Sequence, residues 1–164
     1  MQRSDKHSDV VVFAGHGATG AVNKLVGVLG LDRPLRVGAS DSERAVVFVG
    51  PHEHHSNLLP WRESSALVVA VPEGVDGRVD EAALKAMLEE HKRHPLLIGA
   101  FSAASNVTGI EADVDGITET LHRAGALALW DYAQAAPFAS LDMNPVRMLA
   151  DGSGVNPWVD EDAA

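Results

Sequence analysis

The stretch Ala126-Leu127-Ala128-Leu129-Trp130-Asp131-Tyr132-Ala133-Gln134 places polar side chains directly after a continuous apolar run. An apolar run of this length is typical of a strand that is buried on both faces of a parallel sheet. The carboxylate of Asp131 is therefore expected at the mouth of a buried strand, where an unpaired charge would be costly. The sequence leaves three partners open for it: a cationic group on a ligand, an arginine, or the backbone of a turn that Asp131 caps.

Four more apolar runs lie outward from this stretch, at residues 10–14, 45–49, 67–71 and 96–101. Segments whose apolar residues have helical spacing separate most of these runs. One helix begins near Thr19 and is expected to end at Gly30, a second has Asp80 as its N-cap, and a third begins near Asp113 and stops at Gly125. Strands that alternate with helices predict a doubly wound α/β layer, in which chemistry gathers at the carboxyl ends of the strands.

The first apolar run is followed by Gly15-His16-Gly17-Ala18-Thr19-Gly20, which matches the pattern G-x-G-x-x-G. A dinucleotide site would also need an acidic residue after the next strand, but Asp41 and Glu43 precede that strand. Free N–H groups at a helix N-terminus, with the Thr19 hydroxyl, instead predict a site for one phosphate. A turn that serves only to fold strand onto helix is the other reading.

A polar cluster, His52-Glu53-His54-His55, follows the second apolar run. Imidazole and carboxylate groups are common zinc ligands, but the spacing is not that of H-E-x-x-H. A solvated turn is a second possibility. We favour a third, in which a flat imidazole stacks on a planar heteroaromatic ring. Ser56-Asn57 are expected to cap a helix that begins at Leu58, with Trp61 in the core.

Four motifs along the chain resemble the successive motifs of class V aminotransferases, most closely the cysteine desulfurase-like branch, which uses pyridoxal 5′-phosphate (PLP). They are Gly17-Ala18-Thr19-Gly20-Ala21-Val22-Asn23, Glu53-His54-His55-Ser56-Asn57-Leu58-Leu59-Pro60-Trp61, Ser105-Asn106-Val107-Thr108-Gly109 and Asp131-Tyr132-Ala133-Gln134-Ala135-Ala136-Pro137. The resemblance implies a partial large domain of the PLP-dependent transferase fold (fold type I), a mostly parallel sheet with helices on both faces. That domain would cover residues 10–145, between a polar segment at 1–9 and an irregular tail at 146–164.

The same resemblance implies a role for each matching residue. Ala18 and Thr19 would bind the cofactor phosphate, and His54 would stack on the pyridine ring. Asn106 would lie near the ring hydroxyl and the substrate, Asp131 would pair with the pyridine nitrogen, and Gln134 would hydrogen-bond the ring hydroxyl. For the full-length family the resemblance further implies an amino-acid substrate and a homodimer.

The chain departs from the family where the chemistry would be expected. All four lysines, Lys6, Lys24, Lys85 and Lys92, precede Asp131, whereas the family's Schiff-base lysine follows it, and the chain has no cysteine. We therefore assign no catalytic residue and expect a truncated transferase domain that is inactive alone, because covalent catalysis through an enzyme amine is unavailable. The alternative is a non-catalytic module that binds a phosphorylated small molecule or a complete homologue. A shortened sheet would also favour self-association.

Composition excludes several other classes of function. The 164 residues carry a formal net charge of −10, which repels nucleic acid and anionic membranes. Without cysteine there is neither a disulfide framework nor a thiolate metal site. No apolar run approaches the roughly 20 residues that cross a bilayer. We expect a cytoplasmic protein with no nucleic-acid or membrane partner and no metal.

Overall fold

A four-stranded parallel sheet with the order β2-β1-β3-β4 organises the part of the chain that the structure describes. The structure is a computed structural model that describes residues 10–143, 147–148 and 154–155. The strands of this sheet are β1 (Val46–Val49), β2 (Leu67–Ala70), β3 (Leu97–Ser102) and β4 (Leu127–Asp131). The helices are α1 (Gly17–Val28), the 3₁₀ turn η2 (Asp41–Glu43), α2 (His55–Arg62), α3 (Glu81–His91) and α4 (Val114–Arg123). Near the C-terminus, β5 (Arg147–Met148) and β6 (Gly154–Val155) pair antiparallel.

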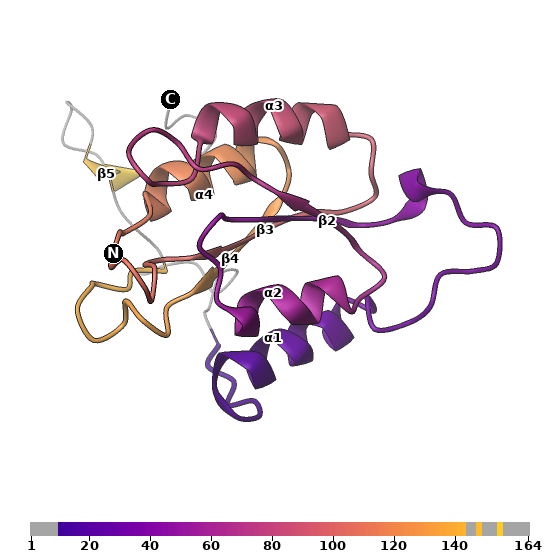
Figure 1. Cartoon of the computed structure of the whole chain (residues 1–164), viewed down its shortest axis with the longest axis horizontal. Helices are drawn as coiled ribbons and strands as arrows, with labels where there is room; N and C mark the ends of the chain where they lie inside the picture. Colours follow the sequence, from indigo (N-terminus) through magenta and orange to yellow (C-terminus); the bar gives the residue numbers. More distant parts are fainter. Residues whose placement is uncertain (1–9, 144–146, 149–153, 156–164) are drawn as a thin grey trace.

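Helices cover both faces of the sheet, with α1 and α2 on one side and α3 and α4 on the other (Figure 1). The strand β1 shows why both faces are apolar, because successive side chains of a strand point to opposite faces. Val47 and Val49 join the core under α1 and α2, whereas Val46 and Phe48 join the core under α3 and α4. All four residues are buried, as expected for the central strands of a doubly wound layer.

The helix ends predicted from sequence are confirmed at several positions. Asp80 caps α3 by accepting a 3.0 Å hydrogen bond from the Ala83 N–H, and Asp113 caps α4 by accepting one from the Gly116 N–H. Gly30 and Gly125 follow α1 and α4 with φ of +71° and +72°, the left-handed conformation that ends helices. Trp61 is completely buried, as predicted.

The predicted first strand, residues 10–14, is wrong. The segment has no partner in either sheet, and the side chains of Val10, Val11, Val12 and Phe13 are 71–98% exposed. A strand is stabilised by backbone hydrogen bonds to a neighbour, and no described strand lies alongside this segment to supply them. The main sheet therefore has four strands where the sequence predicted five.

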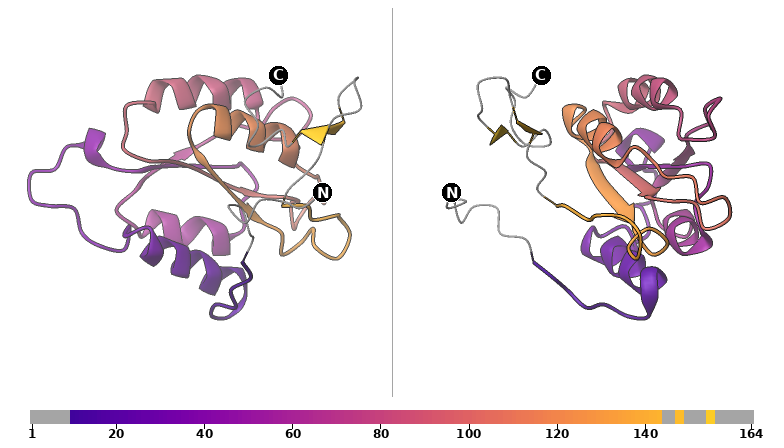
Figure 2. Two further views of the ribbon diagram at one scale, coloured as in Figure 1. Left: turned by 180° about the vertical axis from the view of Figure 1, so that it is seen from behind. Right: turned by 90° about the vertical axis from the view of Figure 1, so that its left-hand side faces the viewer.

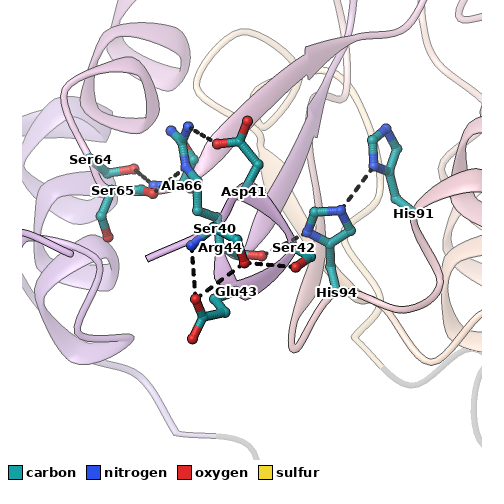
Figure 3. Close-up of polar contacts among 10 residues, drawn as sticks. All are labelled: Ser40, Asp41, Ser42, Glu43, Arg44, Ser64, Ser65, Ala66, His91 and His94. Atoms are coloured by element: carbon teal, nitrogen blue, oxygen red, sulfur yellow. Dashed lines mark hydrogen bonds and ion pairs between the residues drawn. The ribbon is translucent and has the colours of Figure 1, made fainter. Parts of the chain in front are cut away.

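Arg44 joins the amino ends of β1 and β2 (Figure 3). Its guanidinium donates hydrogen bonds of 3.0 and 2.7 Å to the carbonyls of Ser65 and Ala66. Its own carbonyl accepts a 2.9 Å hydrogen bond from Nδ1 of His94. At the amino ends of the strands, the polar groups of Arg44 are therefore bonded within the protein. The candidate site lies at the carboxyl ends.

The two ends of the chain fall largely outside the described residues, and so do the predicted polar segment at 1–9 and most of the predicted irregular tail at 146–164. Within the described ranges, no helix has the length and apolar character needed to cross a membrane. Figure 2 shows from two further directions how the helix pairs enclose the sheet.

Candidate functional site

A pocket of about 270 Å³ opens at the carboxyl ends of β1, β3 and β4. Five of the six residues predicted to bind a cofactor line it, namely Ala18, His54, Asn106, Asp131 and Gln134. The other lining residues are Ser56, Ser102, Ala104 and Ala133. In the sheet, β2 lies on one side of β1, whereas β3 and β4 lie on the other side. The pocket therefore lies where the strand order changes direction.

The N-terminus of α1 forms one wall of this pocket through Ala18. The turn before it is tight, because Gly15 has φ of +62° and a Cβ placed there would lie 2.8 Å from the Cα of Gly20. The N-cap residue His16 makes no side-chain capping bond, and the first N–H groups of a helix have no partner within it. The turn therefore presents free donors and the positive end of the helix dipole beside the pocket.

Thr19, the sixth predicted residue, does not line the pocket but is linked to it. Its hydroxyl donates a 2.8 Å hydrogen bond to Oγ of Ser56, and Ser56 Oγ lies 3.0 Å from Nδ1 of His54. Nδ1 also accepts a 3.2 Å hydrogen bond from the Ser56 N–H. The imidazole therefore carries its acceptor on Nδ1 and is tied to the first turn of α1.

The helix after the histidine cluster begins earlier than predicted. His54 is the N-cap of α2, whose first residue is His55, whereas the sequence predicted that Ser56-Asn57 would cap a helix beginning at Leu58. An imidazole nitrogen that accepts from the Ser56 N–H takes the place of a Ser or Asn oxygen in this cap. The cap holds the His54 ring at the pocket.

Asp131 ends β4 and uses one carboxylate oxygen to cap the following turn. Its Oδ1 accepts a 2.8 Å hydrogen bond from the Ala133 N–H. Among the described residues, Oδ2 makes no hydrogen bond and Asp131 has no ion pair with an arginine. The turn-capping alternative thus applies to one oxygen only, and the other is available to a ligand. At the next residue, burial and the charge of Asp115 raise the pKa of the Tyr132 phenol.

Asn106 lies at the tip of the loop that follows β3. The buried Ser105 holds this loop, because its Oγ accepts hydrogen bonds from the N–H groups of Val107 and Thr108 at 3.3 and 3.2 Å. Gly109, with φ of +74°, then returns the chain. The Asn106 side chain is exposed and reaches the pocket from a loop of defined shape.

Two residues at this end of the sheet, Glu53 and Ser102, were not predicted from sequence as parts of the site. The carboxylate of Glu53 accepts hydrogen bonds from the Ser102 N–H at 2.9 Å, from the Ser102 hydroxyl at 2.7 Å and from the Asn57 amide at 2.7 Å. Asn57 accepts in turn from the buried Trp61 indole at 3.3 Å. The position of Glu53 next to His54 could have indicated that Glu53 belongs to the site. Its contact with Ser102, 49 residues away, could not be predicted from a local pattern.

The alternatives considered for these segments fit the structure less well. Within the described ranges, no group of three or more His, Cys, Asp or Glu side chains could hold a metal ion. His52 turns away from the pocket to bond the Gly77 carbonyl at 3.0 Å. Asp41 and Glu43 belong to η2, at the amino end of β1, whereas the α1 N-terminus lies at the carboxyl ends of the strands. Neither carboxylate is placed to serve a dinucleotide there.

The lysines that the structure describes lie away from the pocket. Lys24 is an exposed residue of α1, and Lys85 and Lys92 pair with Glu81 and Glu89 at α3, on the opposite face of the sheet. None of the three lines the pocket. The geometry therefore offers acceptors, an imidazole and helix N–H donors, but no amine from these residues.

Comparison with known proteins identifies the family. The family model described as "Aminotransferase class-V" matches residues 6–151. The chain belongs to the class V aminotransferase family. A probable cysteine desulfurase of Halalkalibacterium halodurans is 29% identical over 140 residues, covering 83% of the chain. A probable cysteine desulfurase of Mycobacterium leprae is 33% identical over 141 residues, covering 84%. The chain spans 32% of the length of each of these relatives.

Solved structures of this family share the fold. The cysteine desulfurase CsdA of Escherichia coli superposes with a TM-score of 0.55 at 27% identity, covering 73% of this chain and 28% of CsdA. The cysteine desulfurase of Thermococcus onnurineus gives a TM-score of 0.55 at 22% identity, covering 73% of this chain and 28% of its own. The fold class predicted from sequence, a partial fold-type I domain with a parallel sheet and helices on both faces, is confirmed.

Proposed function

We propose that this chain is a PLP-binding part of a cysteine desulfurase-like transferase domain and binds the cofactor without a covalent bond. The observation that carries the proposal is the convergence of Ala18, His54, Asn106, Asp131 and Gln134 on one pocket. They come from the start of α1 and from segments that follow three different strands. Such convergence of acceptor, donor and aromatic groups is what a phosphorylated heteroaromatic ring needs.

Each wall of the pocket suits one part of the cofactor. The free N–H groups at the start of α1 would hold the phosphate. The Thr19 hydroxyl already donates to Ser56, so that it would contribute only after exchanging this bond. The exposed imidazole of His54 would lie against the ring, Asn106 and Gln134 would meet its hydroxyl, and the free Oδ2 of Asp131 would accept from the protonated ring nitrogen.

Bound PLP supplies an electron sink for reactions of amino acids. The residues of this chain would bind and orient the ring, and Asp131 would keep its nitrogen protonated. Because no lysine in the sequence follows Lys92 and the described lysines lie away from the pocket, we propose that the 164-residue chain shows no transaminase or desulfurase turnover by itself. An amino-acid substrate and a homodimer, as in the full-length family, belong to the same proposal.

Titration of the protein with PLP, followed by equilibrium dialysis, tests the binding, and Asp131→Ala is the decisive variant. We expect it to weaken binding about tenfold or more, because a hydrogen bond to a charged partner would be lost. Asp76→Ala is a matched control. Asp76 also accepts from the N–H two residues ahead, Arg78 at 3.1 Å, but lies in an exposed turn away from the pocket.

Two outcomes would count against the proposal. Equal affinity of the Asp131→Ala variant and the Asp76→Ala control would favour the alternative, a simple phosphate site that does not use the ring. An absence of measurable PLP binding to the unaltered chain would refute the proposed function itself.

A further inference from the structure

The Glu53 carboxylate accepts three hydrogen bonds and has no cationic partner in the part of the chain that the structure describes. It accepts from the Ser102 N–H, the Ser102 hydroxyl and the Asn57 amide, and it has no ion pair among the described residues. It is only partly exposed. The hydrogen-bond partners of this carboxylate are all neutral donors, and hydrogen bonds to a carboxylate are shorter and stronger than those between neutral groups.

The direction of each hydrogen bond in this cluster is fixed by chemistry. The Trp61 indole can only donate, so Asn57 must offer its oxygen to Trp61 and its NH₂ to Glu53. An ionised carboxylate can only accept, so the single hydroxyl proton of Ser102 points to Glu53. Toward any other group, the Ser102 oxygen is left as an acceptor.

Ser102 and Asp131 are neighbours on the same face of the sheet. They are register partners in the β3–β4 pair, and both line the pocket. Ala100 and Leu129, two residues earlier on each strand, pack in the core under α1 and α2. The two-residue repeat of a strand puts Ser102 and Asp131 on that same face. One end of the pocket therefore has two adjacent acceptors.

We propose that Glu53 is a positioning residue that orients the Ser102 hydroxyl as an acceptor beside Asp131, so that the pocket selects rings carrying a protonated nitrogen at that end. The inference rests on the proposed function and adds the reason for its selectivity. A carbocyclic ring of the same shape presents C–H where the pyridinium presents N–H, and it would leave both acceptors without a donor.

The test compares two ligands, PLP and its benzene-ring analogue with carbon in place of the ring nitrogen. We expect the unaltered protein to prefer PLP by about tenfold or more. Glu53→Gln should reduce this preference, because the carboxamide NH₂ can face the Ser102 oxygen and turn its proton toward the pocket. Ser102→Ala should reduce it as well, and the double variant should lose no more than Ser102→Ala, since both changes act on one hydroxyl.

Glu90→Gln is the control for lost charge, because Glu90 is exposed on α3 away from the pocket. It should retain the full preference. Loss of affinity for both rings by the same factor in Glu53→Gln would overturn the positioning role and leave the proposed function intact. Failure of the unaltered protein to bind either ring would overturn the proposed function and this inference with it. If circular dichroism shows that Glu53→Gln does not fold, Ser102→Ala decides, and an unchanged preference overturns the proposal.

Discussion

At Gly15, backbone conformation and close packing impose the same requirement. Its φ of +62° lies in the left-handed region, and a Cβ there would meet the backbone of Gly20 at 2.8 Å. Backbone atoms cannot move aside as the end of a side chain can. The turn that brings the α1 N-terminus to the pocket therefore depends on glycine at this position for two separate physical reasons.

We expect Gly15→Ala to lower the free energy of unfolding by more than about 1 kcal/mol, the approximate cost of left-handed backbone in a residue with a Cβ. Urea denaturation followed by circular dichroism measures it. Gly38→Ala is the control, because Gly38 has φ of +82° but open space around its Cβ position. The prediction fails if the two variants are equally destabilised, since the packing against Gly20 would then contribute nothing.

At the scale of elements, η2 shows how a short turn is fixed before β1. The Glu43 carboxylate accepts a 2.8 Å hydrogen bond from the N–H of Ser40, the N-cap residue of η2 (Figure 3). It also forms an ion pair with Arg36 in the preceding loop. The Ser40 backbone hydrogen bond, and then the contact with Arg36, lower the pKa of the Glu43 carboxyl below its ordinary value of 4.5.

A lowered pKa in the folded state means that the ionised Glu43 stabilises the fold above the pKa of the unfolded chain. This contribution should be present at pH 7 and should be lost as the pH falls below 4.5 through the lower pKa of the folded protein. The difference in stability between the unaltered protein and Glu43→Gln should therefore shrink in this range. Denaturation at a series of pH values measures it, and a difference that is constant from pH 7 to pH 3 would contradict it.

At the scale of the whole molecule, two regions of apolar surface are open to contact with other chains. The segment 10–13 is highly exposed, and an apolar groove of about 660 Å³ runs along β4, an edge strand of the main sheet, between α1 and α4. The backbone of an edge strand and an exposed apolar segment both favour association with other chains. The net charge of −10 opposes such contacts, but its effect is weakened by salt.

We expect the protein to self-associate with increasing concentration at moderate salt and Val12→Lys to reduce this association, because it places a charge in the exposed apolar segment. Sedimentation velocity at several concentrations measures the effect. Val37→Lys is the matched control, since the Val37 side chain is also highly exposed but lies in a separate loop. Monomeric behaviour of the unaltered protein at every concentration would rule the expectation out.

Much of the fold and part of the site were predictable because their signals are local. The caps Asp80 and Asp113 and the terminating glycines act within one helical turn, and four of the five apolar runs became strands of the main sheet. The positions of His54, Asn106 and Asp131 after strands sufficed to expect them at one end of a parallel sheet. Their cofactor-binding roles remain predictions.

The sequence alone determined the order of the elements, the two-sided burial of the central strands and the kinds of chemical group at their carboxyl ends, because periodicity and capping depend on near neighbours in the chain. Tertiary structure decided which apolar runs have a strand beside them, so that residues 10–14 remain unpaired. It also decided that Glu53 meets Ser102, a contact across 49 residues. Hydrogen-bond partners so far apart depend on how the strands are ordered, and no local pattern encodes that order.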